Sequence, residues 1–218
     1  GYVGPDYPRW TQTLSDGSEV LIRPIRRQDA AAERAFIAGL SPDSMHNRFL
    51  GHVARPDDDF IERLTDIDYV NDVALVAVVD ENGAEQIVGV SRYAKDPAGA
   101  RCESAVVVAD AWQHRGLATA LMKHLILIAQ ERGLRTMESI DLAGNVGMRD
   151  LARELGFRVR PDPEDAEQVI YTLDLEGKHC CTSYPSRRDP LAHTRPLSPQ
   201  RDRAQNARVP RGENRGDA

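Results

Sequence analysis

The sequence predicts a mixed α/β domain built around one central sheet. Segments with strand-like apolar runs are interspersed with segments whose apolar residues recur every three or four positions, as in amphipathic helices. The Asn82-Gly83 pair between two apolar runs indicates a β-hairpin. The predicted order is strand, helices, three strands, helix, strand, helix and two strands, and such a mixture folds as packed layers of helix and sheet.

Proline and glycine set the boundaries of the N-terminal elements. Residues 1–13 show no periodicity and are expected to form an arm. Residues 14–25 are expected to form a turn around Asp16-Gly17 and then a strand, which Pro24 closes. A helix over 27–40 ends at Gly39. Proline is well suited to the first helical position, and two short helices that begin at a proline are predicted over 42–50 and from Pro56 onward.

Strands alternate with two further helices in the rest of the predicted domain. The long helix that starts at Leu117 ends near Gly133, and the last helix ends before Gly156, because glycine is favoured directly after a helix C-terminus. Strands are predicted over residues 72–80, 85–94, 102–110, 136–142, 157–160 and 168–175, and the last helix over 145–155.

A change in composition marks the end of the folded part. Beyond Leu175 the apolar periodicity stops, so residues 14–177 are expected to form the domain and residues 178–218 a disordered basic tail. The tail contains nine of the 28 Lys and Arg residues and four of the 34 acidic residues, so it carries a charge of +5 and the remainder −11. An acidic body argues against nucleic acid as a partner.

Other features of the sequence indicate the cellular location of the protein. No segment is long and apolar enough to span a membrane, and the N-terminus has no signal-peptide pattern. The three cysteines, Cys102, Cys180 and Cys181, show no metal-ligand spacing, and free thiols are the default in a reducing cytosol. We therefore expect a cytoplasmic protein with no membrane association and no bound metal.

The stretch from Gln113 to Ala118, between a predicted strand and the long helix, has the features of a phosphate site. N–H groups in the first turn of a helix have no intrahelical partner and, together with the helix dipole, favour an anion. Gly116 has no Cβ, so the backbone there can come close to a ligand, and Ala118 is nearly as small. A glycine that only begins the helix is the alternative interpretation.

This stretch resembles the acyl-CoA pyrophosphate loop of the GNAT superfamily of N-acetyltransferases, and NVGMRDLARELGF at 145–157 resembles that superfamily's segment after the fifth strand. Residues 40–49, 64–78 and 102–122 are similar to bacterial Pat-type protein lysine acetyltransferases. The resemblance spans residues 14–175 and implies the GNAT acyl-CoA N-acyltransferase fold with a mixed central sheet, and acetyl-CoA as cosubstrate. The loop residues that it implies bind acetyl-CoA are Gln113, His114, Arg115, Gly116, Leu117 and Ala118.

The resemblance also gives a role to the strand before the loop. Val106, Val107 and Val108 would pair through their backbone with the pantetheine arm of acetyl-CoA, much as an added strand would. An N–H group near Val108 would face the thioester oxygen. Asn145 either caps the last helix or contacts the pantetheine, and both can hold.

Glu103 is the candidate catalytic residue, because it is the only acid in an otherwise small and apolar run. In a cleft, desolvation would raise its pKa toward a useful value, and the matching glutamate of Pat-type domains acts as general base. The residues alone support a structural role of Glu103 as well as the catalytic one. In the structural role, Glu103 is a solvent-facing strand acid or an ion-pair partner of Arg92 or Arg101. The next candidates for the base are Asp68, Glu138 and Asp141.

The general acid is not identified by the sequence. Many GNAT enzymes carry a tyrosine that protonates the leaving thiolate, and Ala152 occupies that position here. Either no acid is required, since a CoA thiolate is a fair leaving group, or another residue serves. Tyr93 and Tyr171 are candidates, although core packing is the more ordinary role for both.

These features together predict an acetyl-CoA-dependent enzyme that acetylates lysine side chains of proteins, for example acyl-CoA synthetases, by direct transfer. The alternatives are an N-acetyltransferase for small amines and a non-catalytic acyl-CoA-binding module that regulates a partner. Fold alone does not decide among them.

Overall fold

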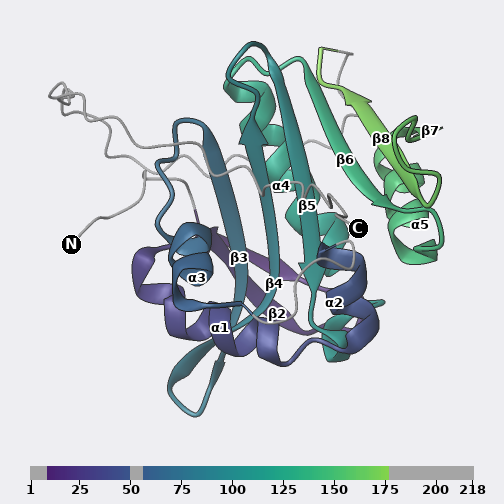
Figure 1. Ribbon diagram of the computed structural model, residues 1–218. Helices are drawn as coiled ribbons and strands as arrows, with labels where there is room; N and C mark the ends of the chain where they lie inside the picture. Colours follow the sequence, from purple (N-terminus) through teal and green to yellow (C-terminus); the bar gives the residue numbers. More distant parts are fainter. Residues whose placement is uncertain (1–8, 50–55, 177–218) are drawn as a thin grey trace, which may run out of the picture. The chain divides into compact units, whose positions relative to one another are not determined.

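The computed structural model describes residues 9–49 and 56–176, which form one sheet with helices on both faces (Figure 1). The strands are β1 (Trp10–Thr13), β2 (Glu19–Pro24), β3 (Asp72–Glu81), β4 (Ala84–Lys95), β5 (Arg101–Val108), β6 (Thr136–Leu142), β7 (Arg158–Pro161) and β8 (Gln168–Asp174). Their order in the sheet is β1-β2-β3-β4-β5-β6-β8-β7. Neighbouring strands are antiparallel except β5 and β6, which are parallel.

The helices lie on opposite faces of this sheet. Three of them lie in front of the sheet in Figure 1, and we call the face that they partly cover the front face: α1 (Ala30–Ala38), α2 (Pro42–Phe49) and α3 (Asp58–Thr65). Behind the sheet lies α4 (Leu117–Glu131), which is joined to α5 (Val146–Leu155) by a hydrogen bond from Thr119 Oγ1 to Glu154. Two short 3-10 helices are η1 (Arg27–Asp29) and η2 (Asp110–Trp112). None of the described helices is long and apolar enough to cross a membrane.

The core forms where the middle of the sheet is covered on both faces. β3 is buried without interruption from Val73 to Val78, as expected for a central strand with helices on both sides. The apolar stripe predicted for α4 packs against the sheet, and its Leu121 and Leu125 are fully buried. Gly89 of β4 permits this close packing, because a Cβ there would lie 2.9 Å from Leu121 Cδ1.

The structure corrects one prediction at the N-terminal end. Residues 10–13, which were expected to belong to an arm, form β1 and pair with β2. The Trp10 ring stacks on His124 of α4, with ring centroids 4.1 Å apart. Four residues give too short a pattern to indicate a strand, and their pairing depends on the edge that β2 supplies. The predicted tail, 178–218, lies outside the described residues.

A buried ion-pair network joins β2 to the start of α1. Arg23 is 1% exposed, and its Nη1 and Nη2 donate to the two carboxylate oxygens of Asp29 at 2.8 and 2.9 Å. Asp29 also accepts the backbone N–H of Arg26, and Arg23 Nη2 reaches Glu85 at 2.6 Å. Burial alone would raise the pKa of Asp29, but the hydrogen bonds from Arg23 and Arg26 outweigh it and hold that pKa below its ordinary value.

Replacing Asp29 with asparagine should therefore destabilise the domain by about 3 kcal/mol at neutral pH, because Arg23 is then buried with an incomplete counter-charge. A carboxylate with a lowered native pKa stabilises the fold above its ordinary pKa and loses that contribution as the pH falls through the native value. The difference between the parent and Asp29→Asn should thus shrink below about pH 4. Urea unfolding at pH 7 and in acid measures both effects, with Glu131→Gln at the exposed end of α4 as control. An unchanged free energy of unfolding at pH 7 would contradict this role of Asp29.

Candidate active site

The candidate site is centred on the place where two neighbouring strands separate. β5 and β6 are paired over three positions, the last of which joins Glu103 to Glu138. Beyond it, β5 stays paired with β4 as far as Val108, and β6 stays paired with β8 as far as Leu142. The two strands therefore diverge after Glu103 and Glu138, and we call the opening between them the fork.

The register of β5 decides which backbone groups face the fork. Ala109 N–H donates to the carbonyl oxygen of Val88 at 2.9 Å, on the β4 side. In an antiparallel ladder the bonded direction alternates from residue to residue, so Val107 is turned toward β4 as well. Val106 and Val108 direct their N–H and C=O groups toward the fork. Of the three valines predicted to offer their backbone to a ligand, these two are in position to do so.

The loop after β5 leads from the open end of the fork into α4. His114 and Gly116 have left-handed backbone conformations, with φ of +60° and +84°. Ala120 N–H donates to the Gly116 carbonyl oxygen, so the N–H groups of residues 117–119 precede the first hydrogen bond within the helix. A Cβ on Gly116 would meet no atom of the described residues within 4 Å. Open space in front of unpaired N–H groups suits an anion.

Two side chains of the loop hold it in place. Gln113 Nε2 donates to the Val108 carbonyl oxygen at 3.2 Å and to Ser44 Oγ at 3.3 Å. Arg115 forms an ion pair of 2.9 Å with Asp16 in the turn between β1 and β2. The side chains of Gln113 and Arg115 are therefore engaged within the protein, and the capacity of this loop for a ligand lies in its backbone.

Hydrogen bonds fix α2 to the end of β5. The Asp110 carboxylate accepts the Ser41 N–H at 2.9 Å, Ser41 Oγ at 2.7 Å and Ser44 Oγ at 2.9 Å. Because α2 contacts both β5 and β6, it lies across the fork on the front face (Figure 1). Sequence reasoning identified Ser41-Pro42 as a helix start, but nothing local linked it to Asp110, which is 69 positions away.

Glu103 lies at the closed end of the fork and is exposed. The two arginines that the sequence offered as its partners are paired with other carboxylates. Arg101 Nη2 lies 2.7 Å from Glu138 Oε1, and Arg92 Nη2 lies 3.3 Å from Glu33 Oε1. Among the described residues, no cation lies within ion-pair distance of Glu103, so its carboxylate is open to a ligand.

Glu103 also belongs to a row of acids that crosses the front face. Asp72, Ala94, Glu103 and Glu138 are direct neighbours on β3, β4, β5 and β6, and paired residues project to the same face of a sheet. We call Asp72, Glu103 and Glu138 the acidic row. Burial raises the pKa of Asp72, and the charge of Asp68 adds to that rise. The row places three carboxylates on this face beside the fork, of which Glu138 is paired with Arg101 and Arg160.

Asn145 acts as the helix cap that the sequence indicated. Its Oδ1 accepts the Met148 N–H at 3.1 Å, and its Nδ2 donates to Asp141 Oδ1 at 3.1 Å. Burial raises the pKa of Asp141 to about 6, against the hydrogen bond from Asn145 and the charge of Arg48. Asp141 therefore stays mostly ionised at neutral pH and is held on the β6 side of the fork.

The tyrosines considered as general acids are buried. Tyr93 and Tyr171 are each 2% exposed, in agreement with a role in core packing, and Ala152 is buried in α5. Burial raises the pKa of Tyr171, and the charge of Asp141 adds to that rise. These three positions offer no exposed proton donor beside the fork.

Volume alone does not locate the site. A surface depression of about 610 Å³ is lined by residues of β1, β2, β3 and β4 and by Trp112, and by no residue of the fork. Within 9–49 and 56–176, no group of His, Cys, Asp and Glu residues is arranged to hold a metal ion. The site is recognised instead by the divergence of β5 and β6, by the loop before α4 and by the acid at the closed end.

Comparison with known proteins agrees with this geometry. The model of the acetyltransferase (GNAT) family matches residues 42–157. Over 166 residues the chain is 46% identical to acetyltransferase PA5475 of Pseudomonas aeruginosa, covering 76% of this chain and 89% of that protein. The GNAT domain of S. lividans PAT superimposes with a TM-score of 0.69 at 28% identity, over 78% of this chain and 99% of the other. An N-acetyltransferase from Staphylococcus aureus Mu50 shares the fold, with a TM-score of 0.58 at 21% identity over 72% of this chain and 99% of the other.

Proposed function

This chain belongs to the GNAT family of acetyltransferases, and from that premise we propose that it transfers the acetyl group of acetyl-CoA to lysine side chains of proteins. Glu103 is the proposed general base, and residues 113–118 are the proposed site of the pyrophosphate. The fork is the observation that carries the proposal, because it places unpaired backbone of β5, the start of α4 and Glu103 around one opening.

The residues present fit acetyl-CoA, the cosubstrate that the GNAT family uses. The open space at Gly116 and the N–H groups of residues 117–119 suit a pyrophosphate. Val106 and Val108 present N–H and C=O groups where a further strand would pair, which suits the amide groups of the pantetheine arm. Gln113 engages the Val108 carbonyl oxygen, so the Val106 groups and the Val108 N–H are the ones directed to the cosubstrate.

The chemistry follows from these positions. Bound acetyl-CoA supplies an acyl group that is activated as a thioester. Glu103 takes a proton from the attacking amine as the C–N bond forms and the C–S bond breaks, with the CoA thiolate as leaving group. An N–H of Val106 or Val108 donates to the thioester oxygen as negative charge grows there. Cys102 is a poor nucleophile for an acyl-enzyme route, because burial raises the pKa of its thiol to about 12.

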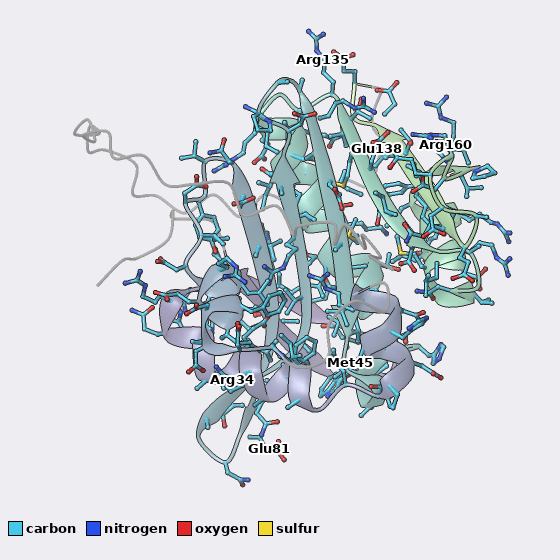
Figure 2. The ribbon with its side chains drawn as sticks, in the orientation of Figure 1. Arg34, Met45, Glu81, Arg135, Glu138 and Arg160 are labelled. Atoms are coloured by element: carbon cyan, nitrogen blue, oxygen red, sulfur yellow. The ribbon has the colours of Figure 1, made fainter. Side chains whose placement is uncertain are left out.

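The acidic row is an argument for an acceptor substrate that is a cation. A lysine ammonium group is charged at neutral pH and is attracted by Asp72, Glu103 and Glu138. Figure 2 labels Glu138 on β6, in a part of the front face that α1, α2 and α3 leave uncovered, so a segment of another protein has access to it. The similarity to the GNAT domain of S. lividans PAT and the Pat-like sequence motifs support a protein acceptor.

Replacing Gly116 with alanine should weaken acetyl-CoA binding by about tenfold or more, equivalent to ~1.4 kcal/mol. The added methyl group would meet none of the described residues and would project into the space proposed for the pyrophosphate. Left-handed backbone disfavours alanine, so a matched control is needed. Gly133→Ala at the other end of α4 has φ of +74° and equally open space. Calorimetry on both folded variants checks the assignment, and equal affinities for acetyl-CoA would contradict it.

Glu103→Gln should keep acetyl-CoA affinity but lower turnover by ~10²–10⁴-fold. Only about one lysine amine in 2,500 is neutral at pH 7, so a group that removes the proton matters most there. The defect should shrink as the pH rises, because more of the amine is then already neutral. The measurement is the pH profile of kcat/KM on one verified acceptor.

Glu138→Gln is the matched control for Glu103→Gln, because it removes a neighbouring carboxylate of the same row that is already bound by Arg101. It should change KM for the acceptor more than kcat. Superimposable pH profiles of kcat/KM for the parent and Glu103→Gln would mean that another group is the base. If the parent turns over no acceptor at all, the non-catalytic acyl-CoA-binding module is favoured.

The acceptor class is tested with labelled acetyl-CoA and a panel of lysine-containing proteins, including acyl-CoA synthetases, beside polyamines, amino acids and aminoglycosides. We expect the label on protein lysines, with faster transfer to lysines in basic surroundings. Added salt should weaken this preference, because exposed charges are screened at about 10 Å at 0.1 M ionic strength. Mass spectrometry locates the modified residues, and efficient turnover of small amines alone would establish the alternative enzyme.

A further inference from the structure

The hairpin formed by β1 and β2 contacts both the loop and the helix that the proposed pyrophosphate site uses. The Trp10 ring of β1 stacks on His124 in the middle of α4. In the turn between β1 and β2, the Ser15 N–H donates to the carbonyl oxygen of Arg115 at 3.0 Å. The hairpin is therefore attached to α4 and, separately, to the loop that precedes it.

The Arg115 side chain joins the turn to the loop a second time. Its Nη1 lies 2.9 Å from Asp16 Oδ2, and its Nη2 donates to the Ala111 carbonyl oxygen at 2.8 Å. Its guanidinium carbon lies 4.6 Å from the centroid of the Trp112 ring, within the range of a cation–π contact. One guanidinium group thus connects the hairpin turn with η2 and with the loop before α4.

Arg115 is also the residue between the two left-handed positions of the loop, His114 and Gly116. A positive φ is uncommon for a residue other than glycine, and His114 has φ of +60°. Such a conformation costs free energy and persists where surrounding contacts require it. The main-chain and side-chain contacts of Arg115 are contacts of this kind, because they fix the residue directly after His114.

We propose that Asp16 and Arg115 are positioning residues for acetyl-CoA: through their ion pair, the turn keeps the loop in the conformation that offers the N–H groups of residues 117–119 to the pyrophosphate. The inference rests on the proposed pyrophosphate site at residues 113–118. A preorganised site loses less conformational freedom on binding, so affinity depends on contacts that do not touch the ligand. The two side chains are 42% and 32% exposed, and such a pair adds little to the stability of the fold.

The two carboxylate oxygens of Asp16 have separate partners, which makes asparagine an informative substitution. Oδ1 accepts the backbone N–H and the hydroxyl group of Ser18, whereas Oδ2 faces Arg115. The amide oxygen of an asparagine keeps an acceptor for Ser18, so Asp16→Asn removes the ion pair and retains the turn. Coulomb attraction alone predicts the opposite result, because loss of a carboxylate near an anion site should tighten the binding of a pyrophosphate.

The test is the affinity of Asp16→Asn for CoA, measured by calorimetry. Binding should weaken by about threefold, in keeping with a partly exposed ion pair. On a verified acceptor, KM for acetyl-CoA should rise by a similar factor while kcat at saturation stays at the parental value. With acetyl-pantetheine, which has no pyrophosphate, kcat/KM should equal that of the parent, whereas general structural damage would lower it. Unchanged or tighter binding of CoA by Asp16→Asn would overturn the proposal.

A double-mutant cycle separates the ion pair from the other contacts of Arg115. Arg115→Gln should weaken CoA binding more than Asp16→Asn, because it also removes the other two contacts of the guanidinium group. In the Arg115→Gln background, Asp16→Asn should cause no further loss. Additive losses would mean that Asp16 acts independently of Arg115, which would overturn the proposal.

Glu176→Gln is the matched control for Asp16→Asn. It removes one carboxylate from an exposed ion pair of similar length, in which Glu176 Oε1 lies 3.1 Å from Arg135 Nε. Figure 2 shows Arg135 at the end of the sheet opposite to Met45 of α2, and the loop before α4 is bonded to α2 through Gln113. Glu176→Gln should therefore bind CoA as the parent does, and an equal loss in both variants would overturn the proposal.

Failure of the proposed pyrophosphate site would look different. Parental affinity for CoA in both Gly116→Ala and Asp16→Asn would overturn the site and the positioning role together. If Gly116→Ala weakens CoA binding and Asp16→Asn does not, the site stands and the positioning role is wrong.

Discussion

The site depends on one β-ladder that is left incomplete. Backbone N–H and C=O groups in the middle of a sheet are normally paired, and leaving them unpaired away from water costs free energy. After Glu103 and Glu138 the pairing between β5 and β6 stops, while β6 completes its own pairing with β8. The sheet stays continuous, but the groups of Val106 and Val108 are presented to the fork. An extended ligand can therefore be held there by main-chain hydrogen bonds.

Ion pairs and hydrogen bonds set the positions of the helices around this opening. Arg23 and Asp29 fix the start of α1, Arg92 and Glu33 join α1 to β4, and Asp110 fixes the start of α2. A buried ion pair adds little net stability, yet removing one partner is costly. We infer that these contacts specify where α1 and α2 lie more than they stabilise the fold, and that this specification matters for the site because α2 lies across the fork.

Local signals predicted much of the fold. Asn82 and Gly83 both have positive φ in the hairpin turn, and Gly156 has φ of +84° directly after α5. Positive φ at such positions depends on the conformational preference of single residues, mainly glycine and asparagine, and these residues can be seen directly in the sequence. The strand at Trp10 to Thr13 was not predicted, and the sequence did not indicate that β8 lies between β6 and β7. Both features arise from strand pairing, and the residue pattern of a strand does not identify the strand that it pairs with.

By itself the sequence determined the type and order of most elements, the glycine-containing loop before α4 and the presence of one acid, Glu103, in an apolar strand. These depend on periodicity, on φ preferences and on the chemical nature of single side chains. Only the tertiary structure decided which backbone groups of residues 106–108 face the fork, because the register of β5 against β4 sets that direction. It also decided that Arg101 pairs with Glu138 rather than Glu103, and that α2 lies across the fork. Contacts between residues far apart in the chain follow from strand pairing and helix packing, which the spacing of residues along the sequence does not encode.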